Sequence, residues 1–198
     1  MRPPFSEPPG PAPQRADSQR IVAAALAAAV ELGPDATLAQ VADRAGIGLA
    51  SLHRYFPTTA AIFAEISRQM YRTLLVQVRE ILGGEDRDLR SVVGKICRIA
   101  FDGPNVSPEY RRRLNLEIPL SWSKTTAEAV YQEVLGEVEA WLASNLAAPP
   151  ADLSARVFLA FAAIRGAVLM TLLYPALAPS TEVMRAHLTD TIVSLLTA

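Results

Sequence analysis

The stretch TLAQVADRAGIGLASLHRYF, residues 37–56, decides how the first part of this chain folds. Thr37 is a favourable N-cap for a helix over 38–45, and Gly46 is the residue type that ends such a helix. After a short turn, a second helix is predicted over 49–55. Two short helices joined by a glycine-containing turn are typical of a helix-turn-helix, whose second helix enters the major groove of DNA.

Longer helices are predicted on both sides of this motif. Before it, apolar residues recur every three or four positions up to residue 32, and Gly33-Pro34 ends the helix. After it, the pattern over 58–82 predicts a helix of about six turns. Residues 1–14 are rich in proline and bury little apolar surface, so they are expected to form a flexible arm.

The rest of the chain also has the pattern of helices, interrupted by proline and glycine. No segment alternates as a strand does, and no fixed repeat is present. The sequence therefore predicts an all-α fold: a flexible arm (1–14), a three-helix helix-turn-helix domain (15–60) and a helical C-terminal domain (61–198). Further helices are predicted at about 87–101, 108–118, 124–147, 151–174 and 180–197.

Composition excludes several classes of protein. The formal net charge is −1, and Cys97 is the single cysteine, so neither a disulfide framework nor a cysteine-rich zinc site is expected. No base is paired with a nucleophile, so we expect no enzyme, no catalytic residue, no metal and no cofactor. No apolar run reaches the length of about 20 residues that spans a membrane. The run 21–30 lies behind the arm within a helical pattern, which disfavours a signal peptide, and a cytoplasmic protein is expected.

Residues 20–63, RIVAAALAAAVELGPDATLAQVADRAGIGLASLHRYFPTTAAIF, resemble the N-terminal domain of the TetR family of transcriptional regulators. The matching features are the helix end at Gly33, Thr37, the VADRAGI core and SLHRYF running into a long helix. The resemblance implies that 49–55 is the recognition helix. It also implies that the C-terminal domain binds a small-molecule effector and forms a homodimer.

The same resemblance implies which side chains touch a double-stranded DNA operator. Arg54 is expected to contact a guanine, the alternative being a solvated charge. Tyr55 is equally well explained as a core aromatic residue. The residues expected nearest the base edges are Leu49, Ala50, Ser51 and Arg54, and those expected at phosphates or supporting them are Thr37, His53, Tyr55, Thr58 and Thr59.

Three positions depart from the family pattern, which usually has tyrosine in place of His53 and lysine in place of Thr59, and often has a polar residue in place of Leu49. The lysine would contact a phosphate, so its absence removes one counterion-releasing contact, although His53 can still donate a hydrogen bond. Residues 15–60 contain four arginines and four acidic residues. We therefore expect weak, salt-sensitive non-specific binding, and specific binding that depends on a dimer placing its recognition helices about 34–36 Å apart.

The C-terminal helices are expected to form a pocket and a dimer seam. The helix over 151–174 is apolar nearly all round, so it should be buried on several sides, and the last two helices of each subunit would form the seam. Arg165 interrupts this apolar run. It is expected to form a structural ion pair, to lie on a solvent-facing edge of the helix or to contact an anionic effector. A pocket for a largely apolar effector is expected from Phe101, Trp122, Tyr131, Trp141, Phe161, Arg165 and Met170, which core packing explains equally well.

The sequence thus predicts a ligand-responsive transcriptional regulator. It would act as a repressor that binds a palindromic operator as a dimer and is released by its effector, with the helix over 58–82 as the mechanical link. The alternative is a helical small-molecule-binding or scaffold protein that has lost DNA binding, which the balanced charge and Thr59 favour.

Overall fold

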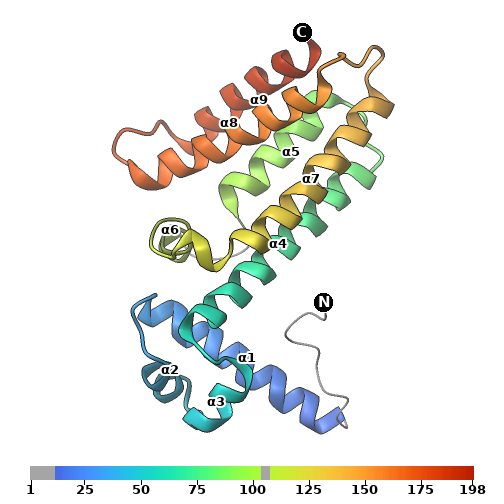
Figure 1. Cartoon of the computed structure of the whole chain (residues 1–198). Helices are drawn as coiled ribbons and strands as arrows, with labels where there is room; N and C mark the ends of the chain where they lie inside the picture. The colour runs from blue at the N-terminus through green and yellow to red at the C-terminus, as the bar shows by residue number, and fades with distance from the viewer. Residues whose placement is uncertain (1–11, 104–107) are drawn as a thin grey trace. The chain divides into compact units, whose positions relative to one another are not determined.

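The computed structural model describes residues 12–103 and 108–198, with side chains described over 19–103 and 111–198. Within those ranges it contains nine α-helices, one short 3-10 helix and no strand, which confirms the all-α prediction (Figure 1). The helices are α1 (Ala12–Leu32), α2 (Leu38–Ala45), α3 (Leu49–Tyr55), α4 (Thr59–Gly83), α5 (Leu89–Asp102), α6 (Pro108–Leu116), η1 (Leu120–Trp122), α7 (Lys124–Asn145), α8 (Leu153–Leu173) and α9 (Thr181–Thr197).

Two elements differ from the sequence prediction. Helix α1 begins at Ala12, so the last three residues of the predicted arm are helical, because a proline such as Pro13 is tolerated in the first turn of a helix. The rest of the arm, residues 1–11, lies outside the described residues. The 3-10 helix η1 was not predicted, because a three-residue element is too short to show a periodic pattern.

The chain divides into two compact units. The first consists of Met1–Arg68 and Glu117–Lys124, and the second of Gln69–Leu116 and Thr125–Ala198. The predicted domain boundary at residue 60 therefore lies eight residues before the division at Arg68, because the first turns of α4 belong to the first unit. There Ile62 and Phe63 are buried, and the Phe63 ring lies 5.9 Å from that of Trp122.

The first unit is built on small residues. Helices α1, α2 and α3 pack against one another, with Ala25 and Ala29 of α1, Val41 of α2 and Leu52 of α3 fully buried. Alanine lets helix backbones approach closely, and the leucine fills the remaining space. Removing such buried methyl groups is costly, so these side chains hold α3 in place.

The second unit has a larger core. Helices α5, α7, α8 and α9 run side by side with the later turns of α4 (Figure 1). Arg185 of α9 donates to both carboxylate oxygens of Asp102 at 3.0 Å and so ties α9 to the end of α5. Fully buried members of the core are Val78, Val92, Cys97, Leu142 and Ile192.

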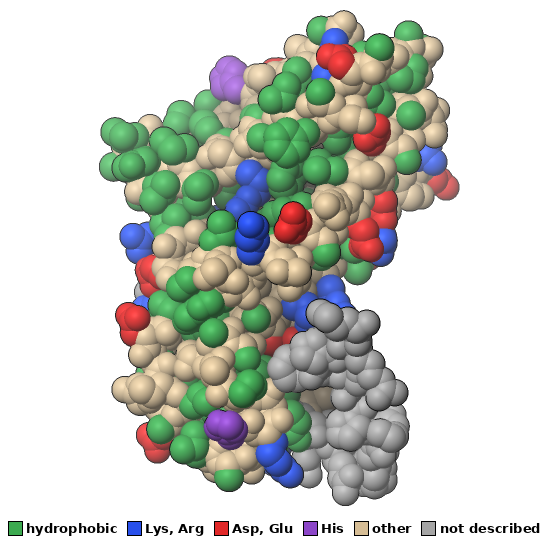
Figure 2. Space-filling model, viewed as in Figure 1, with side chains coloured by type: hydrophobic (Ala, Val, Ile, Leu, Met, Phe, Trp, Pro, Cys, Tyr) green, Lys and Arg blue, Asp and Glu red, His purple; other side chains and the backbone are tan. Residues whose placement is uncertain are grey.

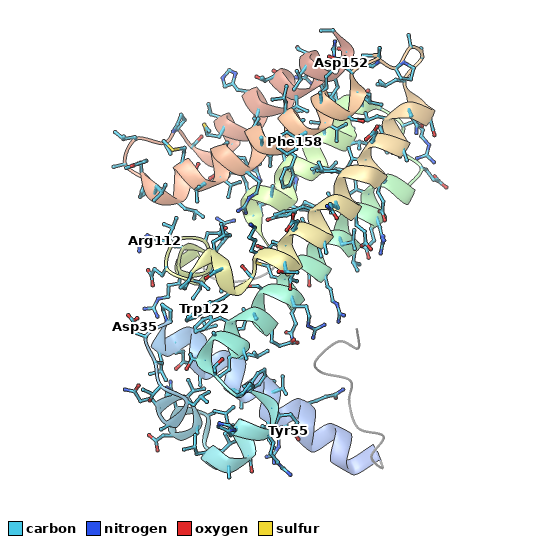
Figure 3. The ribbon with its side chains drawn as sticks, in the orientation of Figure 1. Asp35, Tyr55, Arg112, Trp122, Asp152 and Phe158 are labelled. Carbon is cyan, nitrogen blue, oxygen red and sulfur yellow. The ribbon has the colours of Figure 1, made fainter. Side chains whose placement is uncertain are left out.

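Helix α8 buries one side and exposes the other, so within a single chain it is not buried on several sides as predicted. Val157 and Ala160 face the core, whereas Phe158 is 58% exposed and Met170 54% exposed. Phe158 is labelled in Figure 3, and Figure 2 shows hydrophobic side chains gathered over the α8–α9 end of the molecule. Over the described residues, α8 is also the one helix long and apolar enough, by length and composition, to cross a membrane. Its buried side packs against α5, α6 and α9.

Candidate DNA interface

Helix α2 is held at both ends by local hydrogen bonds. The Gln40 N–H donates to Thr37 Oγ1 at 3.3 Å, and the Thr37 N–H donates back to Gln40 Oε1 at 2.8 Å, which together form a capping box. Gly46 ends the helix with φ of +66°, a left-handed conformation that favours glycine. These contacts confirm Thr37 as the N-cap and set the direction in which the chain enters α3.

Helix α3 has a buried side and an exposed side. Leu52 and the C-cap residue Phe56 are buried, and they anchor the helix to the first unit. Ser51 and Tyr55 are half-buried and lie between the buried and the exposed side. Positions i and i+4 share a helix face, so the exposed residues form two adjoining pairs, Leu49 with His53 and Ala50 with Arg54. The exposed side therefore collects four of the predicted DNA contacts.

Arg54 is the cation that this exposed side presents. Its Cζ lies 6.0 Å from the centre of the Tyr55 ring, a cation–π distance that keeps the side chain near the end of α3. Among the described side chains it forms no ion pair. Arg44 of α2, by contrast, is paired with Glu31 of α1. Tyr55 is labelled in Figure 3 at the end of α3.

Thr58 and Thr59 follow α3 but use their hydroxyl groups differently. Thr58 Oγ1 accepts the Ala61 N–H at 3.1 Å, which leaves its hydroxyl hydrogen able to reach an outside acceptor. Thr59 Oγ1 donates to the Ala36 carbonyl oxygen at 2.8 Å, in a partly buried position. A hydroxyl has one hydrogen, so in this conformation Thr59 cannot also donate to a phosphate. Thr59 thus holds the α1–α2 loop against α4, and the phosphate contact of Thr58 stays a prediction.

Three of the predicted effector residues lie together in the second unit. The Tyr131 ring of α7 packs edge-on against Phe161 of α8, with ring centres 4.7 Å apart, and against Tyr71 of α4 at 5.3 Å. Arg165 Cζ lies 5.7 Å from the Tyr131 ring centre, and Arg165 Nη1 donates a long hydrogen bond to Asn115 Oδ1 at 3.4 Å. Burial raises the pKa of Tyr131 above its ordinary range.

Sequence analysis missed Tyr71 and Asn115, which belong to other helices and share no local pattern with Arg165. One signal was available, because Phe161 and Arg165 are one helical turn apart and so share a face. No carboxylate of the described residues pairs with Arg165, so the expected structural ion pair is not formed there. We call Tyr71, Asn115, Tyr131, Phe161 and Arg165 the Arg165 cluster.

The other predicted effector residues lie elsewhere. Phe101 packs with Val168 and Leu172 in a separate buried cluster. Trp141 belongs to the main core of the second unit, and its indole N–H is buried without a partner among the described residues. Met170 is on the exposed side of α8. Trp122, labelled in Figure 3, belongs to the first unit.

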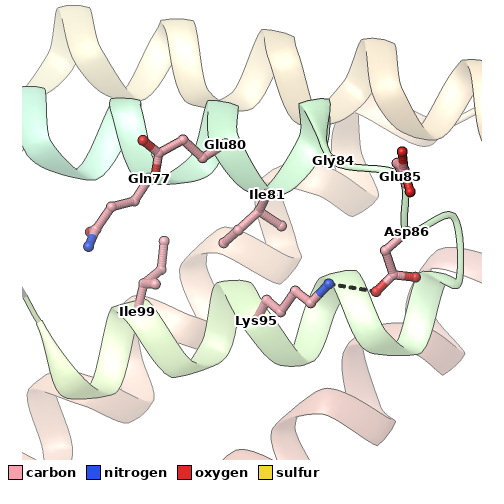
Figure 4. Close-up of a pocket in the computed structure, with 8 residues that line it drawn as sticks. All are labelled: Gln77, Glu80, Ile81, Gly84, Glu85, Asp86, Lys95 and Ile99. Carbon is pink, nitrogen blue, oxygen red and sulfur yellow. Dashed lines mark hydrogen bonds and ion pairs between the residues drawn. The ribbon is translucent and has the colours of Figure 1, made fainter.

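A groove between α4 and α5 has a volume of about 450 Å³ and is open to solvent (Figure 4). Lys95 Nζ lies 2.6 Å from Asp86 Oδ2, and this contact, with the Ser91 hydroxyl, lowers the pKa of Asp86 to about 2. The charges of Lys95 and Asp86 thus pair with each other. The groove is lined by none of the predicted effector residues, its lining being Gln77, Glu80, Ile81, Gly84, Glu85, Asp86, Lys95 and Ile99.

Comparison with known proteins agrees with this geometry. Residues 21–66 match the family model of bacterial regulatory proteins of the tetR family, which confirms the resemblance seen in the sequence. This segment contains α2, α3 and the first turns of α4. No curated protein matches the chain.

Several solved structures share the fold over nearly the whole chain. A TetR-family regulator from Mesorhizobium loti has a TM-score of 0.68 at 14% identity, covering 94% of this chain and 97% of its own. A transcriptional regulator from Rhodococcus sp. RHA1 has a TM-score of 0.67 at 20% identity, covering 91% and 97%. SmeT in complex with triclosan has a TM-score of 0.67 at 18% identity, covering 90% of each chain. The chain thus has the fold of TetR-family transcriptional regulators.

Proposed function

We propose that this protein is a cytoplasmic transcriptional regulator, a repressor that binds a palindromic DNA operator as a homodimer. The observation that carries the proposal is the exposed side of α3, where Arg54 and three other predicted contact residues face away from a buried Leu52 and Phe56. A helix whose outward cation forms no ion pair among the described residues is suited to base contacts in a major groove.

The proposed dimer uses the exposed side of α8 and the turn into α9. Leu159 and Leu173 of α8 and Leu177 of the turn are exposed apolar residues, alongside Phe158 and Met170. Contiguous exposed apolar surface of this kind marks an interaction site in globular proteins. A second copy of the same face would bury it in a four-helix seam. Phe158→Asp should therefore convert a dimer to monomers in sedimentation velocity, whereas Thr73→Asp on α4, outside both helices of the proposed seam and with its hydroxyl bonded within α4, should not.

The proposed effector site is the Arg165 cluster. Its three aromatic rings would pack against a largely apolar effector, and Arg165 would meet a polar or anionic group on it. That SmeT, a protein of similar fold, forms a complex with triclosan supports a small-molecule ligand for this protein. Helix α4 contributes residues to both units and would couple the sites, so effector and operator should weaken each other's binding by equal factors.

The test of DNA binding begins with selection from a random duplex pool by the full chain at low salt. An inverted repeat should be enriched, and Arg54→Ala should weaken its binding at least about tenfold, because each bidentate base contact is worth about 1–3 kcal/mol. Arg72→Ala, which removes an exposed arginine from the second unit, is the matched control. If no repeat is enriched, the protein is better described by the alternative, a helical small-molecule-binding or scaffold protein without DNA binding, which the engaged Thr59 hydroxyl favours.

A further inference from the structure

Leu49 is a large apolar residue on the exposed side of α3. It is the first residue of α3 and is 47% exposed, whereas Leu52, three positions further along the helix, is fully buried. Gly48, which precedes it as the N-cap, has no side chain that would cover it. The leucine therefore stands at the leading end of the side of α3 that we propose faces DNA.

The chemistry of base edges limits what such a side chain can contact. In the major groove the four base pairs present hydrogen-bond donors and acceptors, and the C5-methyl of thymine is the one apolar group among them. Leu49 has no polar atom and cannot satisfy a donor or an acceptor. Placed against a polar edge, it would remove that edge from water without replacing its hydrogen bond, which is costly.

We propose that Leu49 is a specificity-determining residue that packs against a thymine methyl in each half of the operator. This inference rests on the proposed DNA-binding function. Ala50, the next exposed residue, is small enough to let α3 approach the base edges. Arg54, one turn beyond Ala50, is then placed to contact a guanine. Each half-site should therefore combine a thymine that Leu49 requires with a guanine that Arg54 requires.

A methyl-deletion cycle tests the contact directly. The operator is the duplex selected by the full chain, and each thymine is replaced in turn by deoxyuridine, which lacks only the C5-methyl group. Binding is measured by fluorescence anisotropy at one fixed salt concentration, because affinity for DNA depends strongly on salt. The proteins compared are the native chain, Leu49→Ala and Leu32→Ala, whose leucine is also exposed in the first unit and lies on α1.

The native chain should lose about fourfold in affinity when one particular thymine in one half-site becomes deoxyuridine, as expected for one buried methyl group. Replacing the equivalent thymine in both half-sites should cost about fifteenfold. Leu32→Ala should keep this sensitivity. Leu49→Ala should bind the thymine and deoxyuridine duplexes equally well, because the two deletions remove the same contact.

Two outcomes would overturn the inference while leaving the proposed function intact. One is a selected duplex that binds equally well with deoxyuridine at every position. The other is a methyl dependence that persists unchanged in Leu49→Ala, which would assign the contact to another residue. Failure of the selection to enrich any inverted repeat would instead reject the proposed function itself.

Discussion

The hydrogen bond from Thr59 to the α1–α2 loop gives a sharp prediction about the stability of the first unit. Thr59→Val keeps the β-branched shape but removes the hydroxyl that donates to the Ala36 carbonyl at 2.8 Å. No backbone N–H of the described turns and caps donates to that carbonyl. The substitution therefore leaves a partly buried acceptor without its partner.

The size of the effect follows from that loss. A typical hydrogen bond contributes about 0.5–1.5 kcal/mol to stability, and an unsatisfied buried group adds to the cost. We expect Thr59→Val to lower the unfolding free energy of the first unit by about 1–2 kcal/mol. For a domain of about 60–100 residues, each kcal/mol corresponds to about 4–8 °C in melting temperature.

Because each unit contains one tryptophan, the stability of the two units can be measured separately by fluorescence. Trp122 belongs to the first unit and packs against Phe63, whereas Trp141 lies in the core of the second. In a Trp141→Phe background, Trp122 is the only tryptophan left in the chain. Its fluorescence during urea unfolding, at one fixed protein concentration, then reports the first unit.

Thr73→Val is the matched control. The Thr73 hydroxyl donates to the Gln69 carbonyl within α4 at an exposed position, where water can replace it. We expect a change below about 0.5 kcal/mol there, as for most surface substitutions. Equal effects of Thr59→Val and Thr73→Val on the Trp122 transition would refute the assigned role of Thr59.

Three further predictions concern buried and charged groups. Leu52→Ala should destabilise the first unit by about 2–5 kcal/mol in the same Trp122 assay, because the leucine is fully buried. Cys97 is buried and its pKa is raised by that burial, so a thiol reagent such as DTNB should react with it only after unfolding; fast reaction of the native protein would contradict this. The pKa of Asp86 is lowered to about 2, so its contribution to stability is present above about pH 4 and is lost as the pH falls towards 2. Asp86→Asn should therefore reduce the loss of stability over that range, measured as urea midpoints, and an unchanged acid dependence would count against the Lys95 contact.

Sequence patterns predicted most of the fold because the interactions that define a helix are local. The N-cap at Thr37 and the helix end at Gly46 depend on residues within a few positions along the chain, so both were predicted from residue types, whereas the Gln40 half of the capping box was not. The contact residues of α3 came instead from the resemblance to the family, and the structure shows Leu49, Ala50, His53 and Arg54 exposed and Ser51 half-buried.

The predicted effector pocket shows where local reasoning ends. Aromatic residues in a helical pattern suit both a pocket and a core, and periodicity does not separate the two. Packing brought Tyr131, Phe161 and Arg165 together, and it placed Trp122 in the first unit and Trp141 in the core of the second.

The sequence by itself determined the helix-turn-helix and its caps at Thr37 and Gly46. Tertiary structure alone decided that the Thr59 hydroxyl binds Ala36, 23 positions away, and that Arg165 meets Asn115, 50 positions away. The physical reason is the range of the interactions. Caps and helix faces depend on neighbours along the chain, whereas the partner of a side-chain donor depends on which distant segments the core brings together.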